Sequence, residues 1–238
     1  MLKIEHLSYT AEDGEKEIIR DLSLTLEDKS FAVITGPNGG GKTTLAKLIM
    51  GLEKPTGGRI LWNDEDITDL SVTERAKRGV SYGFQQPPRF KGMTVYDLLK
   101  IASGREMTRI ECCDYLTKVG LCARDYVDRD MDDSLSGGEA KRIEIATILA
   151  RKSELMIFDE PEAGIDLWSF SKLTDTFGSI REKREATLIV ISHQERLIAL
   201  ADEIILIDGG QVTAKGTPEE MLPRMMGGTV SVCERLEG

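Results

Sequence analysis

The chain has 238 residues, with 31 Lys and Arg against 41 Asp and Glu, which gives a net charge of −10. So acidic a chain is not expected to bind nucleic acid, because such binders need a basic surface that releases counterions from phosphates. Its length allows one large or two small domains. No apolar run approaches the ~18 residues of a membrane span, and the N-terminus shows no signal-peptide stretch. We therefore expect a cytoplasmic protein without direct membrane insertion.

The first thirty residues are predicted to form antiparallel strands, at 4–10 and 17–26, around a polar tip at 11–16. Further along, short apolar runs alternate with longer amphipathic stretches at 42–50 and 138–151. Runs that are both short and fully apolar are typical of central strands buried on both faces. These runs cover residues 31–35, 155–159, 187–192 and 203–208. The pattern predicts an α/β fold with a mainly parallel sheet.

Residues 90–135 depart from this alternation, because they show helical periodicity and no strand candidate. The residues of the two expected apolar helix faces are Leu98, Leu99, Ile101 and Ala102, and Tyr115, Leu116 and Val119. We interpret the segment as a helical insertion between a strand that ends at Phe84 and a helix that starts near Gly138. A last helix is expected to begin at Thr217-Pro218-Glu219-Glu220.

The cysteines at 112, 113, 122 and 233 contain no C-x-x-C pair. Free, buried thiols in a reducing compartment are the expected reading, and a metal role is a weaker alternative.

The segment GPNGGGKTT at residues 36–44 matches the pattern G-x-x-x-x-G-K-[ST] between a predicted strand and a predicted helix. Its glycines allow consecutive N–H groups to face an anion, and the helix adds its positive N-terminal end. Lys42 is expected to reach the β- and γ-phosphates, Thr43 to bind Mg²⁺, and Thr44 to serve the α-phosphate. The candidate nucleotide-binding residues here are Gly36, Pro37, Asn38, Gly39, Gly40, Gly41, Lys42, Thr43 and Thr44.

A second anion-binding turn is predicted at Ser136, Gly137, Gly138 and Glu139, directly ahead of an amphipathic helix. Taken alone, these residues favour an ordinary serine N-cap followed by glycine over an anion site. Two such turns on one chain raise the question of how both serve a single γ-phosphate.

Acidic and basic candidates follow the buried strands. Asp159 is expected to hold Mg²⁺ through water, and Glu160 to polarise the attacking water. His193 is expected at the same sheet edge as Lys42, because ligands gather at the carboxyl ends of parallel strands. There it would contact the γ-phosphate and help to orient the water.

Two further residues leave alternatives open. Gln85 is a candidate contact for Mg²⁺ or water, and its neighbour Gln86 competes because spacing does not separate them. Tyr9 is a candidate for stacking on adenine, with packing in the core as the alternative.

The motifs GPNGGGKTT, FQQ, LSGGE, LMIFDE, AGID and SH, in this order, resemble the nucleotide-binding domain of ATP-binding cassette (ABC) proteins. The resemblance implies a P-loop NTPase core with a mainly parallel sheet, an N-terminal antiparallel β subdomain and an inserted α-helical subdomain. We place the core at 1–88 and 152–238 and the helical subdomain, with the signature motif, at 89–151. ATP and Mg²⁺ are the implied cofactors, and ATP hydrolysis to ADP and phosphate is the implied reaction.

The same resemblance assigns Gln85 to the Q-loop, Asp166 to the D-loop, and His193 to the switch position. In this family two domains close head to tail, and the signature turn of each caps the ATP held by the other. The resemblance therefore resolves the question of the two anion sites and implies a homodimer on ATP binding.

A narrower resemblance is to the SufC-like ATPase of the SUF iron–sulfur cluster assembly system. It rests on RDMDDSLSGGEAKRIEIATIL, DEPEAGIDLWS, ISHQERLI and FQQPPRFKGMTV. Many relatives carry a different pair where this chain has Glu162 and Ala163. The expected partner is a SufB-like scaffold, and the alternative is a transmembrane transporter subunit.

Overall fold

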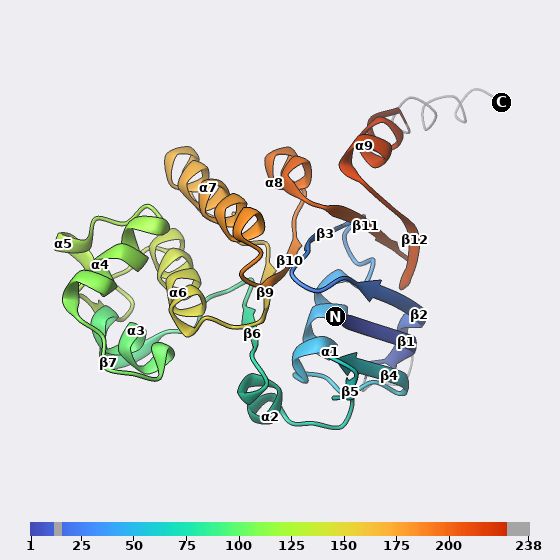
Figure 1. Ribbon diagram of the computed structural model, residues 1–238, viewed down its shortest axis with the longest axis horizontal. Coiled ribbons are helices and arrows are strands. Elements are labelled where there is room, and N and C mark those ends of the chain that lie inside the picture. Colours follow the sequence, from blue (N-terminus) through green and yellow to red (C-terminus); the bar gives the residue numbers. More distant parts are fainter. Residues whose placement is uncertain (12–15, 228–238) are drawn as a thin grey trace.

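A computed structural model describes residues 1–11 and 16–227 of the chain (Figure 1). Its largest sheet has six strands in the order β12-β11-β3-β10-β9-β6, all parallel except β12. The strands are β3 (Phe31–Thr35), β6 (Val80–Gly83), β9 (Leu155–Asp159), β10 (Thr187–Ile191), β11 (Glu203–Asp208) and β12 (Gln211–Gly216). The α/β prediction is confirmed, as are the four apolar runs, although the third ends one residue early.

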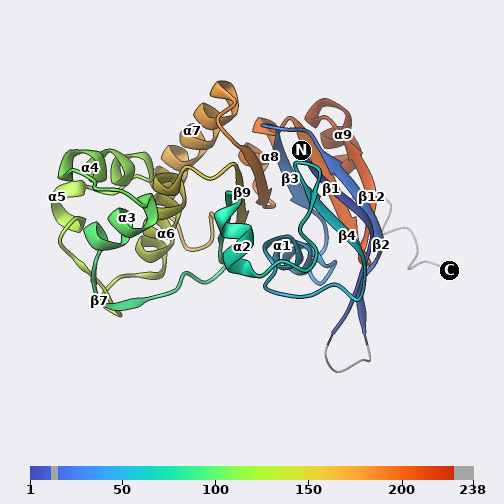
Figure 2. The same cartoon turned by 60° about the horizontal axis from the view of Figure 1, so that its bottom comes forward.

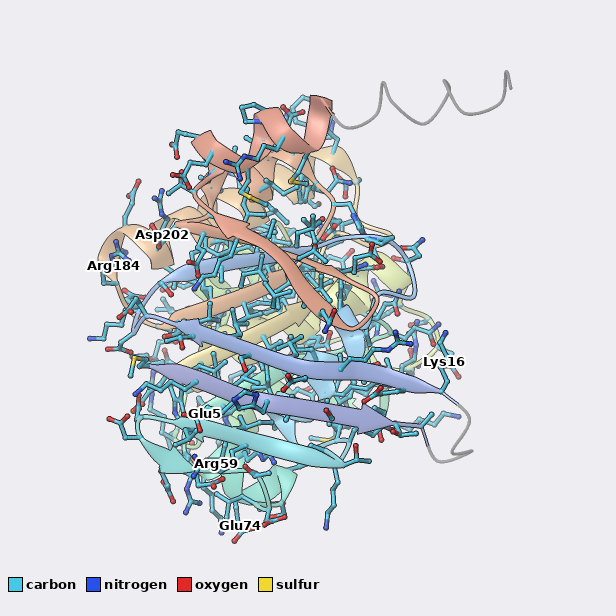
Figure 3. The ribbon with its side chains drawn as sticks, turned by 90° about the vertical axis from the view of Figure 1, so that its right-hand side faces the viewer. Glu5, Lys16, Arg59, Glu74, Arg184 and Asp202 are labelled. Carbon is cyan, nitrogen blue, oxygen red and sulfur yellow. The ribbon has the colours of Figure 1, made fainter. Side chains whose placement is uncertain are left out.

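The N-terminal strands form a separate antiparallel sheet in the order β2-β1-β4-β5, as predicted for the first thirty residues. Its strands are β1 (Leu2–Thr10), β2 (Glu17–Leu26), β4 (Gly57–Trp62) and β5 (Glu65–Asp66). Glu5 and Arg59 are directly opposite each other on β1 and β4, and their side chains form an ion pair of 2.7 Å (Figure 3). Residues 12–15 of the predicted polar tip lie outside the described residues.

The helical insertion contains α3 (Val95–Ser103), α4 (Arg109–Lys118) and α5 (Ala123–Tyr126), and it leads into α6 (Gly137–Arg151). It also contains a two-stranded antiparallel sheet, β7 (Phe90–Thr94) with β8 (Asp130–Met131), so the prediction of no strand there is wrong. The strand FKGMT has a glycine at its centre and no apolar alternation, so its pattern gives no sign of a strand.

The predicted helix faces are largely correct. Leu98 and Leu99 are buried, as are Tyr115, Leu116 and Val119. Ile101 is an error, because it is 66% exposed on the outer side of α3.

The other helices are α1 (Lys42–Met50), α2 (Val72–Lys77), α7 (Leu167–Lys183), α8 (Glu195–Leu200) and α9 (Pro218–Gly227). Helices α1 and α9 begin where the sequence predicted. None of the helices within residues 1–11 and 16–227 is both long and apolar enough to cross a membrane.

Two hydrophobic cores lie on the two faces of the parallel sheet, because successive strand residues point to opposite sides. On β3, Phe31 and Val33 join the core that contains α6 and α7, whereas Ala32 and Ile34 join the core that contains α1 and the antiparallel strands. The insertion packs on the first of these cores, away from the antiparallel sheet (Figures 1 and 2). The boundaries 88/89 and 151/152 stay a prediction.

The described cysteines are free thiols, but only Cys112 is buried, whereas Cys122 is exposed. Cys233 lies outside the described residues. Within the described part of the chain, no three His, Cys, Asp or Glu side chains gather as a potential metal site.

Candidate nucleotide site

The glycine-rich loop at residues 36–44 joins β3 to α1, at the carboxyl edge of the parallel sheet. Gly36 has φ = 136°, and a Cβ there would lie 2.1 Å from the carbonyl oxygen of Ile207. Gly41 has φ = 102° and precedes the first residue of α1. Glycine is therefore required at both positions, once for conformation and close approach and once for the sharp entry into the helix.

The loop forms one wall of a cavity of ≈360 Å³. The residues that line it are Lys16, Ile18, Asn38, Gly39, Gly40, Gly41, Lys42, Thr43, Thr44, Gln85 and Glu160. Seven of the nine predicted loop residues are thus brought together with Gln85 and Glu160, as expected. Lys16 and Ile18 were not predicted from the sequence. They lie just before and within β2, about twenty residues upstream of the loop.

Lys42 is buried within the loop. Its Nζ donates to the carbonyl oxygens of Gly36 at 2.7 Å and Pro37 at 2.9 Å. Burial lowers the pKa of Lys42, while the carboxylates of Glu160 and Asp159 act in the opposite direction. A cation held in the cavity by backbone carbonyls is placed to neutralise a phosphate.

Thr43 and Asp159 meet behind the loop. Thr43 Oγ1 donates to Asp159 Oδ1 at 3.2 Å, and the hydroxyl of Tyr82 donates to Asp159 Oδ2 at 3.0 Å. Burial raises the pKa of Asp159, and these two hydrogen bonds lower it. A hydroxyl and a carboxylate are hard oxygen ligands of the kind that Mg²⁺ prefers, so the donor set fits that ion.

Glu160 follows β9 with φ = 46°, a left-handed conformation that is uncommon for a residue other than glycine. Its N–H donates to Ile191 O at 3.0 Å, which ties it to the end of β10. Its Oε2 accepts a hydrogen bond of 2.9 Å from Gln85 Nε2. Because Gln86 does not line the cavity, this geometry favours Gln85 over Gln86.

His193 is exposed just beyond β10, on the same sheet edge. Its Nδ1 lies 3.3 Å from Thr35 Oγ1 at the end of β3. The predicted position is therefore correct, but the imidazole does not line the cavity in a single chain.

For Tyr9, the structure favours packing in the core, and stacking on adenine stays a prediction. Tyr9 is buried among the core residues of the antiparallel sheet, its hydroxyl donates to Glu53 Oε2 at 2.8 Å, and it does not line the cavity. The alternation along β1 explains this, since Leu7 and Tyr9 point to the same buried side.

The Ser-Gly turn begins α6. Ser136 Oγ accepts from the N–H of Glu139 at 3.3 Å, and Glu139 accepts from the N–H of Ser136 at 2.6 Å, which makes a complete capping box. The hydroxyl of Tyr126 also donates to Glu139, and these bonds hold the pKa of Glu139 at about 2. The serine N-cap reading is therefore correct, whether or not the turn also binds an anion.

Gly138 of this turn lies against the loop that precedes α7. A Cβ on Gly138 would lie 2.2 Å from Gly164 O, so the two segments touch through their backbones. Asp166 caps α7 by accepting from the N–H groups of Trp168 at 3.1 Å and Ser169 at 3.0 Å, which lowers its pKa. The next two side chains project outward, with Leu167 64% and Trp168 82% exposed.

None of residues 136–139, nor Asp166, lines the nucleotide cavity of the chain described here. The two anion-binding turns are therefore separate in one molecule. A larger cavity of ≈720 Å³ involves neither of them, because it lies beside Met156 and Ala186, near the amino ends of β9 and β10.

A buried ion pair on α6, between Lys141 and Glu144, was not predicted from the sequence. Lys141 Nζ donates to the carbonyl oxygens of Phe84 and, at 3.1 Å, of Asp159, while Glu144 Oε1 accepts from the N–H of Phe84 at 3.0 Å. Burial lowers the pKa of Lys141 and raises that of Glu144 to about 7. One sequence signal could have revealed this pair: Lys141 and Glu144 are opposite charges three residues apart on an otherwise apolar helix face.

Comparison with known proteins agrees with this geometry. The sequence matches the ABC transporter family over residues 19–163. It is 40% identical over 229 residues to an uncharacterised ABC transporter ATP-binding protein of Methanocaldococcus jannaschii, covering 93% of this chain and 90% of that protein. It is 30% identical over 212 residues to the lipopolysaccharide export ATP-binding protein LptB of Haemophilus influenzae, covering 87% of each.

Solved structures show the same fold. A dimeric bacterial ABC transporter cassette superposes with a TM-score of 0.83 at 24% identity, over 92% of this chain and 99% of that one. The cbiO1 protein of Clostridium perfringens, part of an ABC transporter complex, superposes with a TM-score of 0.76 at 26% identity, over 99% and 95%. The chain described here belongs to the ABC transporter ATP-binding family and is an ATPase that uses ATP with Mg²⁺.

Proposed function

We propose that this chain is the ATP-hydrolysing subunit of a larger complex, and that two copies close over two ATP molecules. In each site, residues 36–44 hold the phosphates. Thr43, Gln85 and Asp159 would hold Mg²⁺, which would offset the negative charge of the phosphates. Glu160 accepts a proton from water while the water oxygen bonds to the γ-phosphorus. The bond from that phosphorus to the ADP oxygen then breaks, which leaves ADP and phosphate. His193 helps to orient the water.

The observation that carries the dimer is the separation of the two turns. The loop at 36–44 lines the cavity, whereas Ser136 and its neighbours begin a different helix and do not. A helix N-terminus offers free N–H groups to an anion, so a second copy that brings its turn to this cavity would enclose the γ-phosphate. The site is incomplete without that copy, and we place Asp166 at the contact between the two.

The partner is proposed to be a transmembrane transporter subunit. This reading draws its support from the names of two relatives, an ABC transporter ATP-binding protein and the ATP-binding protein of a lipopolysaccharide export system. It is the alternative raised by the sequence, and it is better supported than the iron–sulfur scaffold that the sequence placed first.

A SufB-like scaffold is the second candidate, and one specific observation favours it. After the signature glycines the chain reads EAKRIEI, in which Lys141 and Glu144 form the buried pair described above. The sequence resemblance to SufC-like ATPases rests partly on this segment. The catalytic chemistry would be identical for both partners.

Isolation of the chain from a native extract, with identification of its stoichiometric partner, tests these readings. An integral membrane protein is the expected companion. A soluble scaffold that co-purifies in its place would transfer the assignment to iron–sulfur cluster assembly. A purified complex without ATP turnover would contradict both.

A further inference from the structure

The ≈720 Å³ cavity near the amino ends of β9 and β10 has no part in the nucleotide chemistry described above. Its volume is twice the ≈360 Å³ of the nucleotide cavity. Protein interiors contain few voids larger than a water molecule, whereas pockets for small ligands measure about 300–1,000 Å³. A hollow of this size is therefore typical of a ligand site rather than of a packing defect.

The walls of this cavity come from two parts of the chain. The carboxyl ends of α4 and α6 form one side, and α7 forms the other. The hydroxyl of Thr176 on α7 donates to the carbonyl oxygen of Lys118, the last residue of α4, at 2.7 Å. This hydrogen bond fixes the helical insertion against α7, so the chain itself holds the walls in place. Ligand pockets occur preferentially at such junctions.

The floor of the cavity is apolar. Leu149, Met156 and Ile180 line it with exposures of 5% to 8%, and Ala186 is 3% exposed. The ring of Tyr115, 9% exposed, lies in the same lining. A polar body placed on this floor would lose its contacts with water without replacement, so the ligand must bring apolar surface.

Charged side chains of one predominant sign surround this floor. The charged residues of the lining are Lys118, Lys152, Lys172, Lys183, Asp175 and Glu185. None of these six forms an ion pair with another residue within 1–11 and 16–227. Four lysines against two acids leave an excess of two positive charges, in a chain whose net charge is −10. Such a local excess favours an anion.

The position of one ammonium group relative to the floor is defined. Lys118 Nζ lies 5.0 Å from the centroid of the Tyr115 ring, and both residues line the cavity. The positive charge therefore stands directly beside apolar surface. Contact with an aromatic face stabilises an ammonium group only modestly, so Lys118 still gains from an anionic partner.

We propose that this cavity binds a small organic anion, which lays an apolar body on the floor and places one or two acidic groups among the lysines. Lysine acts as a compact point charge, so a carboxylate, a phosphate or a sulfonate can serve as the acidic group. The proposal is independent of the proposed function, since it involves neither the nucleotide nor the partner protein.

The two ligand sites do not overlap. Met156 of the floor is the second residue of β9, whereas Asp159 of the nucleotide site is the last. Three residues of a strand span about 10 Å, and the two sites lie toward opposite edges of the sheet. A bound nucleotide therefore leaves this cavity free.

Two fluorescent probes test the class of ligand. 8-Anilinonaphthalene-1-sulfonate and N-phenyl-1-naphthylamine share their rings, but only the first carries a sulfonate. Each is titrated into the chain saturated with Mg²⁺ and ADP, which keeps the nucleotide cavity occupied. We expect one sulfonate probe to bind per chain, about tenfold more tightly than the neutral probe, and to weaken between about 0.05 and 0.5 M NaCl. Equal affinities, salt-independent binding, or no binding of the sulfonate probe would overturn the proposal.

Two pairs of lysines separate the site from the net charge of the chain. Lys118→Gln with Lys172→Gln removes two charges from the lining, and Lys54→Gln with Lys77→Gln removes two exposed lysines elsewhere. The first pair should weaken the sulfonate probe about tenfold and leave the neutral probe unchanged, because only the sulfonate meets the lysines. The second pair should change neither probe. Equal losses in both pairs contradict a site at these lysines.

A filled cavity locates the apolar body. Ser179 and Ser171 are both half-buried on α7, but only Ser179 lines the cavity. Ser179→Phe should weaken the sulfonate probe at least about tenfold, whereas Ser171→Phe should not. Full binding by Ser179→Phe would place the probe elsewhere and refute the assignment. The lysine pair is exposed and decides the question even if Ser179→Phe does not fold. The readout needs no hydrolysis, so its failure is distinct from a failure of ATP turnover or dimerisation.

Discussion

Glu160 combines an uncommon backbone conformation with a catalytic position. Its left-handed φ of 46° is maintained by the hydrogen bond to Ile191 O, and its carboxylate faces the phosphate loop beside Gln85. Residues held in such conformations are concentrated at functional sites, where the surrounding structure compensates the strain. The ends of β9 and β10 therefore fix the orientation of the Glu160 side chain.

Substitution of Glu160 tests its role as the base. Glu160→Gln should lower ATP turnover at least ~100-fold, because proton acceptance by a positioned base contributes factors of that order. ATP affinity, measured by equilibrium binding, should change little, since the phosphates are held by residues 36–44. Glu182→Gln, an exposed acid on α7, is the matched control and should keep full turnover. Loss of ATP binding in Glu160→Gln would assign the residue to the nucleotide rather than to the water.

The two adjacent glutamines give a second comparison at this scale. Gln85→Ala removes the amide that contacts Glu160 at 2.9 Å and should lower turnover about tenfold or more. Gln86→Ala removes an exposed side chain outside the cavity and should leave turnover unchanged. Steady-state phosphate release measures both. Equal effects of the two substitutions would contradict the assignment of Gln85.

At the scale of elements, α6 carries the Ser-Gly turn at one end and the buried ion pair in its second turn. The capping box therefore fixes the N-terminus of the helix that also contacts Phe84 and Asp159. Stability of this end depends on the ionisation of Glu139.

The pH dependence of that end has a definite sign. The pKa of Glu139 falls from 4.5 to about 2 on folding, so its contribution is complete above pH 4.5 and is lost as the pH falls toward 2. Glu139→Ala should lower the free energy of unfolding by about 1 kcal/mol near neutral pH, with a smaller difference below pH 4. Urea unfolding at several pH values measures this, with Asp114→Ala on α4 as the control. A difference that is independent of pH would exclude ionised Glu139 as the cause.

The sequence predicted those elements whose residue pattern follows from their own burial or backbone conformation. Buried parallel strands read as unbroken apolar runs, and the loop at 36–44 requires glycine for local reasons. The strands β7 and β8 were missed because they are short, because most of β7 is exposed, and because they pair across about forty residues. No local pattern records such a pairing.

Site residues divide in the same way. The positions of Lys42, Thr43 and Asp159 were predictable, because Asp159 ends β9 and the other two residues begin the helix that follows β3. The position of Tyr9 was not predictable. Strand alternation places its side chain in the core or in the cavity only once the register of β1 is known. Ile18 lines the cavity only because β2 returns past the phosphate loop, which is a property of the fold.

For the whole molecule, the head-to-tail pairing predicts complementation between two inactive variants. Lys42→Ala disables the phosphate loop, and Gly137→Asp places a negative charge in the Ser-Gly turn. In a mixture, each dimer that contains both variants has one intact site, whereas neither variant forms an intact site with its own kind. Phosphate release should therefore recover to at most about half of the wild-type rate. Each variant alone should stay inactive, and a mixture without recovery would show that the sites are not shared.

Nucleotide should also control the assembly. Glu160→Gln with ATP and Mg²⁺ should form dimers by light scattering, because binding is retained while hydrolysis is blocked. Lys42→Ala under the same conditions should stay monomeric. A Glu160→Gln monomer at saturating ATP would contradict the shared enclosure of the nucleotide.

The exposed indole at the start of α7 gives this closure an optical readout. The chain has two tryptophans, of which Trp62 is 2% exposed and Trp168 is 82% exposed beside Asp166. Trp62 contributes a constant background emission, so any ATP-dependent shift to shorter wavelength, or protection from acrylamide quenching, comes from Trp168. The intrinsic fluorescence of the unlabelled protein can thus report ATP-dependent dimerisation.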